Sequence, residues 1–117
     1  MSKMKGQLGE DYAADWLEFH GFCILARNYY SRYGEIDIIA ENSQYIVFVE
    51  VKTREQGAMV SPLEAVTKGK QKKLWITAQQ YLVAHPSKLQ PRFDLAAVTS
   101  VRGKLYGLEY YPNAFGI

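Results

Sequence analysis

The stretch GEIDIIAENSQYIVFVEVKT, residues 34–53, contains two apolar segments rich in isoleucine and valine on either side of a polar turn. Segments of this kind predict β-strands, here over residues 34–40 and 45–53. The residues between them, 41–44, are typical of a tight turn. The sequence therefore predicts a β-hairpin, from which the rest of the fold can be worked outward.

The hairpin would bring acidic side chains together. If its turn is centred between residues 42 and 43, Asp37 lies opposite Phe48. Side chains alternate with period two, so Glu50 and Lys52 share the face of Phe48 and Asp37. Glu50 is then diagonal to Asp37, at roughly 7 Å or less between β-carbons. We expect the two carboxylates to converge, with the lysine one side chain further along.

Two interpretations of this grouping remain open. The strand over residues 46–51 is apolar at odd and even positions, which indicates burial on both faces. A buried carboxylate or ammonium requires a partner, because unpaired burial costs several kcal/mol. In one interpretation, Lys52 forms a structural ion pair with Glu50 or Asp37. In the other, Asp37 and Glu50 bind Mg²⁺ or Mn²⁺, which prefer oxygen ligands, and Lys52 positions a water molecule.

The remaining segments predict an α/β domain. Residues 6–20 carry apolar side chains at helical spacing and end at Gly21. Further predicted elements are strands over 22–30, 92–100 and 104–110, a loop over 57–61, and a helix from Ser61 (N-cap) through Pro62 and Glu64 (capping box) to Ala84, with a break near Thr67–Gly69. The order αβββαββ predicts a mixed central sheet flanked by helices. Its strands at 45–53 and 92–100 should be parallel, joined by a right-handed crossover.

Length and composition indicate one soluble domain. The chain has 117 residues, of which 48% are hydrophobic and 22% charged, so we expect a single domain over residues 1–117. One cysteine, Cys23, excludes an internal disulfide, and its apolar strand places it in the core. No apolar run is long enough for a membrane span or a signal peptide. We therefore expect a cytoplasmic protein with no membrane partner.

Charge is distributed unevenly along the chain. Residues 1–50 carry a net charge of −4, residues 51–73 of +4, and residues 74–117 of +2. This arrangement suits a polyanionic partner that also meets a cation held by carboxylates. An ordinary solvated surface is the alternative, and charge alone favours it.

At the acidic hairpin the sequence resembles a known superfamily. An aspartate followed, on the next strand, by Glu-x-Lys (Asp37, then Glu50 and Lys52) resembles the PD-(D/E)XK nucleases, although Ile36 stands where the superfamily has proline. The whole chain is similar to the bacterial YraN-like family of predicted nucleases. The matching stretches are Gly6-x-x-Gly9-Glu10, Arg27-Asn28-Tyr29, Gly34-Glu35-Ile36-Asp37, Phe48-Val49-Glu50-Val51-Lys52-Thr53-Arg54, Glu64-Ala65-Val66, Lys70-Gln71, Tyr81-Leu82 and Arg92-Phe93-Asp94.

The resemblance implies a fold and an activity. The fold would be restriction-endonuclease-like, with metal ligands at Asp37 and Glu50 and a catalytic lysine at Lys52. The implied activity is Mg²⁺- or Mn²⁺-dependent hydrolysis of phosphodiester bonds in DNA, with branched DNA and RNA as open alternatives. Resolvase-like members of the superfamily suggest a homodimer. A non-catalytic nucleic-acid-binding module that retains the nuclease fold is the alternative function.

Further residues are candidates for the same site. Glu10 resembles in placement the first-helix glutamate of junction-resolving nucleases, and a first-turn acid favoured by the helix dipole is the alternative. Nucleic-acid contacts are predicted for Arg54, Lys68, Lys70, Gln71, Lys72 and Lys73. The alternatives are a solvated helix face for the lysines and a pair with Glu55 for Arg54.

Overall fold

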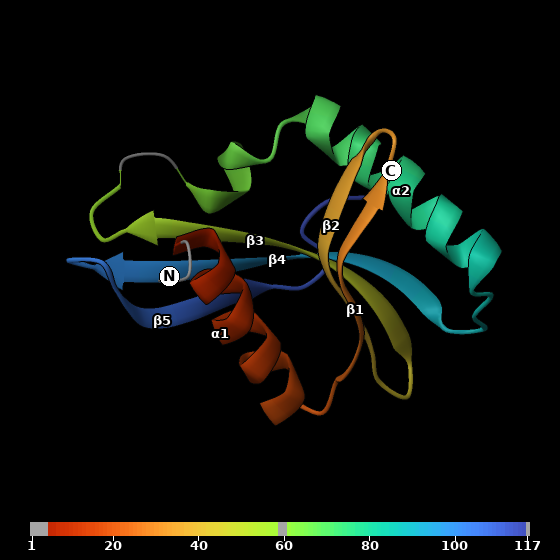
Figure 1. Ribbon diagram of the computed structural model, residues 1–117, viewed down its shortest axis with the longest axis horizontal. Helices are drawn as coiled ribbons and strands as arrows, with labels where there is room; N and C mark the ends of the chain where they lie inside the picture. The colour runs from red at the N-terminus through yellow and green to blue at the C-terminus, as the bar shows by residue number, and fades with distance from the viewer. Residues whose placement is uncertain (1–4, 59–60, 117) are drawn as a thin grey trace.

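The computed structural model describes residues 5–58 and 61–116 and contains one five-stranded sheet with a helix on each side (Figure 1). Its elements are α1 (Lys5–Phe19), β1 (Cys23–Ser31), β2 (Gly34–Glu41), β3 (Tyr45–Glu55), the 3-10 helix η1 (Pro62–Ala65), α2 (Lys68–Ala84), β4 (Gln90–Val101) and β5 (Lys104–Tyr111). Residues 59 and 60 of the predicted loop 57–61 lie outside the described residues. The predicted order αβββαββ is confirmed.

The sheet is mixed, as predicted. Its strands lie in the order β1-β2-β3-β4-β5, and β3 pairs with β4 in parallel while the other neighbours are antiparallel. A parallel pair needs a long crossover, which η1 and α2 supply. The central position of β3 explains why its sequence is apolar on both faces.

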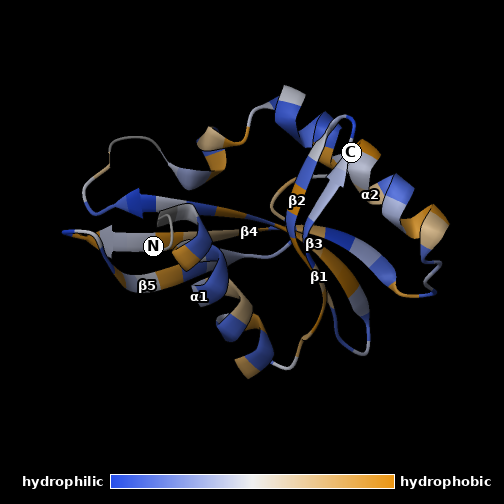
Figure 2. Ribbon diagram, in the orientation of Figure 1, coloured by the Kyte–Doolittle hydropathy of each residue, from blue (hydrophilic) through white to orange (hydrophobic). Residues whose placement is uncertain are grey.

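Two hydrophobic clusters form the core, one on each face of the sheet. Ala13 and Leu17 of α1 pack on the first face, against Val47 and Val49 of β3. The opposite face carries Phe48, which packs with residues of α2 such as Leu74, Ala78 and Tyr81. Figure 2 shows apolar residues concentrated along the middle of the sheet. Burial of each large apolar side chain contributes about 1.5–3 kcal/mol to folding.

The register of the β2–β3 hairpin differs from the prediction. Ile38 pairs with Val49, so the turn is centred one residue later than expected and the predicted pairing of Asp37 with Phe48 is wrong. The cause is the side chain of Asn42, whose Oδ1 accepts hydrogen bonds from the backbone N–H groups of residues 44 and 45, at 2.9 and 2.8 Å. The shift moves each partner by two residues, so the faces predicted for Asp37 and Glu50 are unchanged.

The segment before α2 is broken, as the glycine at position 69 suggested. η1 ends before Val66, and α2 begins after Thr67, whose Oγ1 accepts a hydrogen bond from the Lys70 N–H at 3.2 Å. The predicted capping box at Ser61 does not form, because the Ser61 side chain makes no capping hydrogen bond. Within the described ranges, no helix is long and apolar enough to cross a membrane.

Cys23 lies on the surface rather than in the core. It is the first residue of β1, which is an edge strand of the sheet. Side chains of β1 alternate between exposed and half-buried positions, and Cys23 occupies an exposed one. The expectation of a buried thiol was wrong because periodicity alone does not show which strand forms the edge.

Candidate functional site

The β2 and β3 strands separate at the end of their ladder, and Asp37 lies at this fork. Their pairing runs from Glu41 and Ile46 to Ile38 and Val49. Beyond it, the Val51 N–H donates a hydrogen bond to Asp37 Oδ2 at 2.8 Å. The fork opens into a cavity of about 440 Å³. Its lining residues are Tyr33, Gly34, Glu35 and Asp37 near or on β2, Glu50 on β3, and Thr67, Gly69, Lys70, Lys73 and Leu74 at or on α2.

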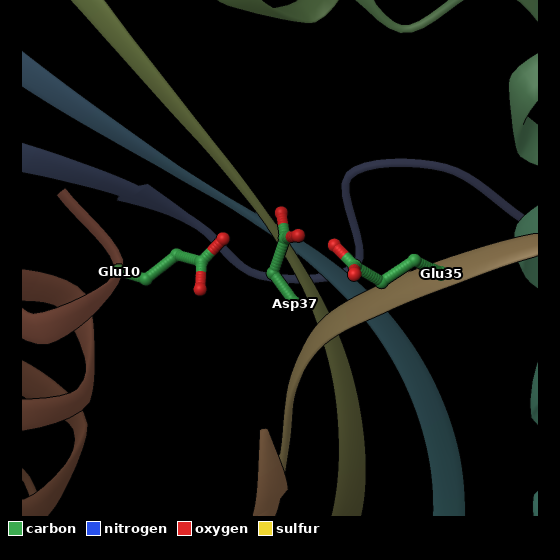
Figure 3. A group of neighbouring side chains, drawn as sticks. All are labelled: Glu10, Glu35 and Asp37. Atoms are coloured by element: carbon green, nitrogen blue, oxygen red, sulfur yellow. The ribbon is translucent and has the colours of Figure 1, made fainter. Parts of the chain in front are cut away.

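Three carboxylates meet at the fork. Oxygen atoms of Glu10, Glu35 and Asp37 lie within 4.8 Å of one another, with Glu10 contributed by α1 and the other two by β2 (Figure 3). Glu35 was not predicted as a ligand. The signal was present, because Glu35 and Asp37 are two residues apart on one strand and so point to one side. This donor set consists of oxygen atoms alone.

Glu50 supplies a fourth carboxylate, from β3. Its side chain is almost completely buried, at 2% exposure. Lys70 Nζ lies 2.8 Å from Glu50 Oε2, yet among the described residues this oxygen accepts no hydrogen bond of good geometry. The contact is therefore mainly an attraction between charges, and Glu50 Oε2 retains capacity for a further ligand.

Burial and neighbouring charges shift the pKa values of two residues at the fork, Asp37 and Lys70. Burial, with the hydrogen bond and the negative charge of Glu50, raises the pKa of Asp37 to about 9, against the opposing effect of the Val51 N–H. Burial lowers the pKa of Lys70, but the close contact with Glu50 and the negative charge of Glu50 outweigh this and raise it. At neutral pH, and with no cation present, Asp37 therefore retains its proton.

A second buried acid, Asp94, differs from the acids of the fork because neighbouring groups supply hydrogen bonds to both of its carboxylate oxygens. Arg92 contacts both of its carboxylate oxygens through Nε and a terminal nitrogen, at 2.9 Å each. The Tyr110 hydroxyl and the Asn113 N–H complete the shell. Asp94 therefore has the structural role expected of a buried ion pair, whereas among the described residues the carboxylates at the fork outnumber the bases that pair with them.

Glu10 reaches the fork because α1 lies close to β3. A Cβ atom at Gly9 would collide with Thr53 Oγ1, so this approach requires glycine. Asn28 Nδ2 then donates a hydrogen bond to Glu10 Oε1 at 2.8 Å. Asn28 has a φ of 52°, in the left-handed region that asparagine tolerates better than most residues. The backbone at Asn28 thus directs its amide at Glu10.

The five residues of α2 that were predicted to contact nucleic acid divide between two sides of the helix. Lys70 and Lys73 line the acidic cavity. Lys68, Gln71 and Lys72 line a separate surface hollow. The Gln71 amide is also engaged by the backbone, because its Nε2 donates to Val66 O at 3.0 Å. The structure therefore brings two of these five residues to the fork.

The two predicted basic residues of β3 lie beyond the fork. Lys52 is half-buried, two residues after Glu50, and is not among the residues that line the cavity. Arg54 lies further along and lines a different cavity with residues of β4 and β5. Among the residues that the structure describes, Lys70 is thus the lysine whose ammonium contacts an acid of the site.

These observations define a class: a small α/β protein with a mixed five-stranded sheet and an acidic cluster compatible with a metal ion. Residues 9–98 match the uncharacterised protein family UPF0102, and the chain belongs to this family. UPF0102 proteins of Dichelobacter nodosus, Clostridium botulinum and Dictyoglomus turgidum are 45%, 42% and 39% identical to it. The alignments cover 96%, 96% and 97% of this chain and 89%, 94% and 98% of those proteins. The YraN-like resemblance is thereby confirmed.

Proposed function

We propose that this protein is a nuclease that hydrolyses phosphodiester bonds of DNA with Mg²⁺ or Mn²⁺. On this proposal its sheet and helices form a restriction-endonuclease-like core of the PD-(D/E)XK type. The observation that carries the proposal is the convergence of Glu35, Asp37 and Glu50 on one cavity that Lys70 and Lys73 also line, with Glu10 of α1 close to Glu35 and Asp37. Such a cavity combines groups for a cation with groups for a phosphate.

The chemistry of the donor set fits a hard divalent cation. Asp37 and Glu50 would hold it, with Glu10 and Glu35 as neighbouring oxygen donors. Glu50 Oε2 is buried without a well-aligned hydrogen bond, as expected of an atom that awaits a ligand. When bound, the cation would stabilise charge on the phosphodiester and lower the pKa of an attacking water.

The protein's own cations have separate roles in this proposal. Lys70 neutralises Glu50 and can contact a phosphate oxygen from the same cavity, as can Lys73. Lys52 follows Glu50 on β3 and remains the proposed residue for orienting water. Lys68, Lys72 and Arg54 would bind the DNA backbone further from the fork.

Metal binding and cleavage test the proposal together. We expect Mn²⁺ to raise the melting temperature of the wild type by on the order of 10 °C when it is present at about a hundred times its Kd. The same ion should activate cleavage of plasmid DNA. The Glu50→Gln variant should show neither effect, whereas Glu64→Gln, an exposed acid on η1, should behave as the wild type.

The alternative is a nucleic-acid-binding module without turnover. Such a module would bind DNA with an affinity that falls steeply with salt and does not respond to divalent ions. If wild-type protein binds DNA but neither binds Mn²⁺ nor cleaves any DNA substrate, the nuclease proposal is wrong and this alternative replaces it.

Replacement of Asn28 by glycine should impair the site without unfolding the protein. Glycine adopts a φ of 52° freely but cannot hold Glu10. We expect Asn28→Gly to require more Mn²⁺ for half-maximal cleavage and to cleave about 10–100-fold more slowly, which is typical for the loss of a group that orients a metal ligand.

A second substitution separates this effect from backbone strain. Asn28→Ala loses the same amide but, unlike Asn28→Gly, keeps a Cβ in the left-handed region, which costs roughly 1–2 kcal/mol relative to glycine. Its melting temperature should therefore fall below that of Asn28→Gly, with a similar loss of activity. Wild-type cleavage by Asn28→Gly at every Mn²⁺ concentration would show that Asn28 does not position Glu10.

A further inference from the structure

Two large aromatic side chains are exposed at the tip of the β1–β2 hairpin. Tyr30 is 70% exposed and Tyr33 is 46% exposed. The strands close at Ser31 and Gly34, which leaves Arg32 and Tyr33 as the turn. The guanidinium of Arg32 lies 5.6 Å from the centroid of the Tyr33 ring. The hairpin tip, residues 30–33, therefore presents two rings and a cation to solvent.

This tip borders the acidic cavity. Tyr33 is one of the residues that line the cavity. Tyr30 lies directly opposite Glu35 in the β1–β2 ladder, so the two side chains lie side by side on one face of the sheet. Both rings thus lie next to the carboxylates that would hold the cation.

The tip is held in place by hydrogen bonds. Ser31 Oγ lies 2.7 Å from Oγ1 of Thr77, a buried residue of α2. The Tyr33 N–H also donates to Ser31 Oγ, at 3.0 Å. Because the backbone of the tip is anchored to α2, its rings can be ordered before a ligand arrives, which lowers the entropy lost on binding.

Three cationic side chains near the rings are placed to contact the phosphates of a nucleic-acid strand. Arg32 lies on the tip, and Lys70 and Lys73 lie across the cavity. Aromatic rings beside a cationic groove are the means by which proteins bind single strands, because every base has a face that can stack while the cations contact the phosphates. Bases inside a duplex are stacked on each other and do not offer such a face.

We propose that Tyr30 and Tyr33 stack on unpaired bases next to the phosphate to be cleaved, so that the substrate class is DNA with a single-stranded segment at the cut. This inference rests on the proposed nuclease function for the position of the phosphate. The stacking itself requires neither the cation nor turnover.

Binding without metal tests the stacking directly. The probe is a short, fluorescently labelled DNA single strand of mixed sequence in EDTA, read by anisotropy and compared with the same sequence as a blunt duplex. We expect the wild type to bind the single strand at least about tenfold more tightly. The double variant Tyr30→Leu/Tyr33→Leu should lose this preference, and Tyr30→Phe/Tyr33→Phe should retain it.

Two controls make the result specific. Tyr106 is 69% exposed on β5 and is not a lining residue of the acidic cavity, so Tyr106→Leu should bind as the wild type. An oligonucleotide with abasic positions should bind equally weakly to the wild type and to the leucine double variant. Equal affinity of the wild type and the double variant for the intact single strand would overturn the inference, as would a comparable loss in Tyr106→Leu.

The two proposals can fail separately. Ring-dependent binding of the single strand without cleavage in Mn²⁺ would overturn the nuclease proposal and leave the stacking intact. Cleavage of duplex and single strand at equal rates, unaffected by the leucine double variant, would overturn the substrate class alone. Binding of single-stranded RNA more than tenfold more tightly than DNA would overturn the assignment to DNA.

Discussion

Asp37→Asn should abolish Mn²⁺-dependent cleavage while leaving the protein folded. The substitution removes a charge from the centre of the acidic cluster, and the loss of several kcal/mol of charge stabilisation corresponds to a fall in rate of about a thousandfold or more. The fold should persist because the asparagine carbonyl oxygen can still accept the hydrogen bond that the Val51 N–H donates to Asp37 Oδ2. Initial rates on a DNA containing a single-stranded segment are the appropriate measurement.

Matched variants define what this loss means. Asp15→Asn makes the same chemical change at an exposed position of α1 and should retain full activity. Asp37→Asn/Glu50→Gln should be no less active than either single variant, because groups that hold one cation act as a unit. Substantial cleavage by Asp37→Asn, or losses that multiply in the double variant, would contradict a shared site.

The same substitution should stabilise the metal-free protein at alkaline pH. The pKa of Asp37 is raised to about 9 in the folded state, from an ordinary value of 3.8, so the folded protein binds its proton more tightly than the unfolded chain does. Stability of the wild type must then fall as the pH rises from about 4 towards about 9. Asparagine does not titrate, and the Asp37→Asn variant should escape this loss, which is on the order of a few kcal/mol.

Urea denaturation in EDTA, at intervals between about pH 5 and pH 9, measures the effect. The difference in unfolding free energy between Asp37→Asn and the wild type should be small at the acidic end and grow with pH. The corresponding difference for Asp15→Asn should stay nearly constant. Parallel stability curves for Asp37→Asn and the wild type would show that the fork does not retain a proton.

These two expectations have one physical origin. The carboxylates of the fork destabilise the protein when no cation is present, and they are the groups that would bind one. Asp94 offers the contrast within the same molecule, because Arg92, Tyr110 and the Asn113 N–H satisfy it completely. A cluster of acids that is retained despite its destabilising effect is more typical of a functional site than of a structural one.

The common face of Asp37 and Glu50 followed from the sequence. It depends on the alternation of side chains along two strands, which is a local property of the backbone. The turn at Asn42 moved the register by two residues, and a shift of two leaves every side chain on its original face. The parallel pairing of β3 with β4 was likewise predictable, since a helix between two strands leaves few other connections.

The composition of the site was decided by the tertiary structure. Glu10 joins Glu35 and Asp37 because Gly9 allows α1 to approach β3, and Lys70 meets Glu50 because α2 packs on the face of the sheet that carries Glu50. Neither distance is set by spacing along the chain. Local periodicity determines the face to which a side chain points, but the packing of separate elements determines which side chains on that face meet, and only the folded chain specifies that packing.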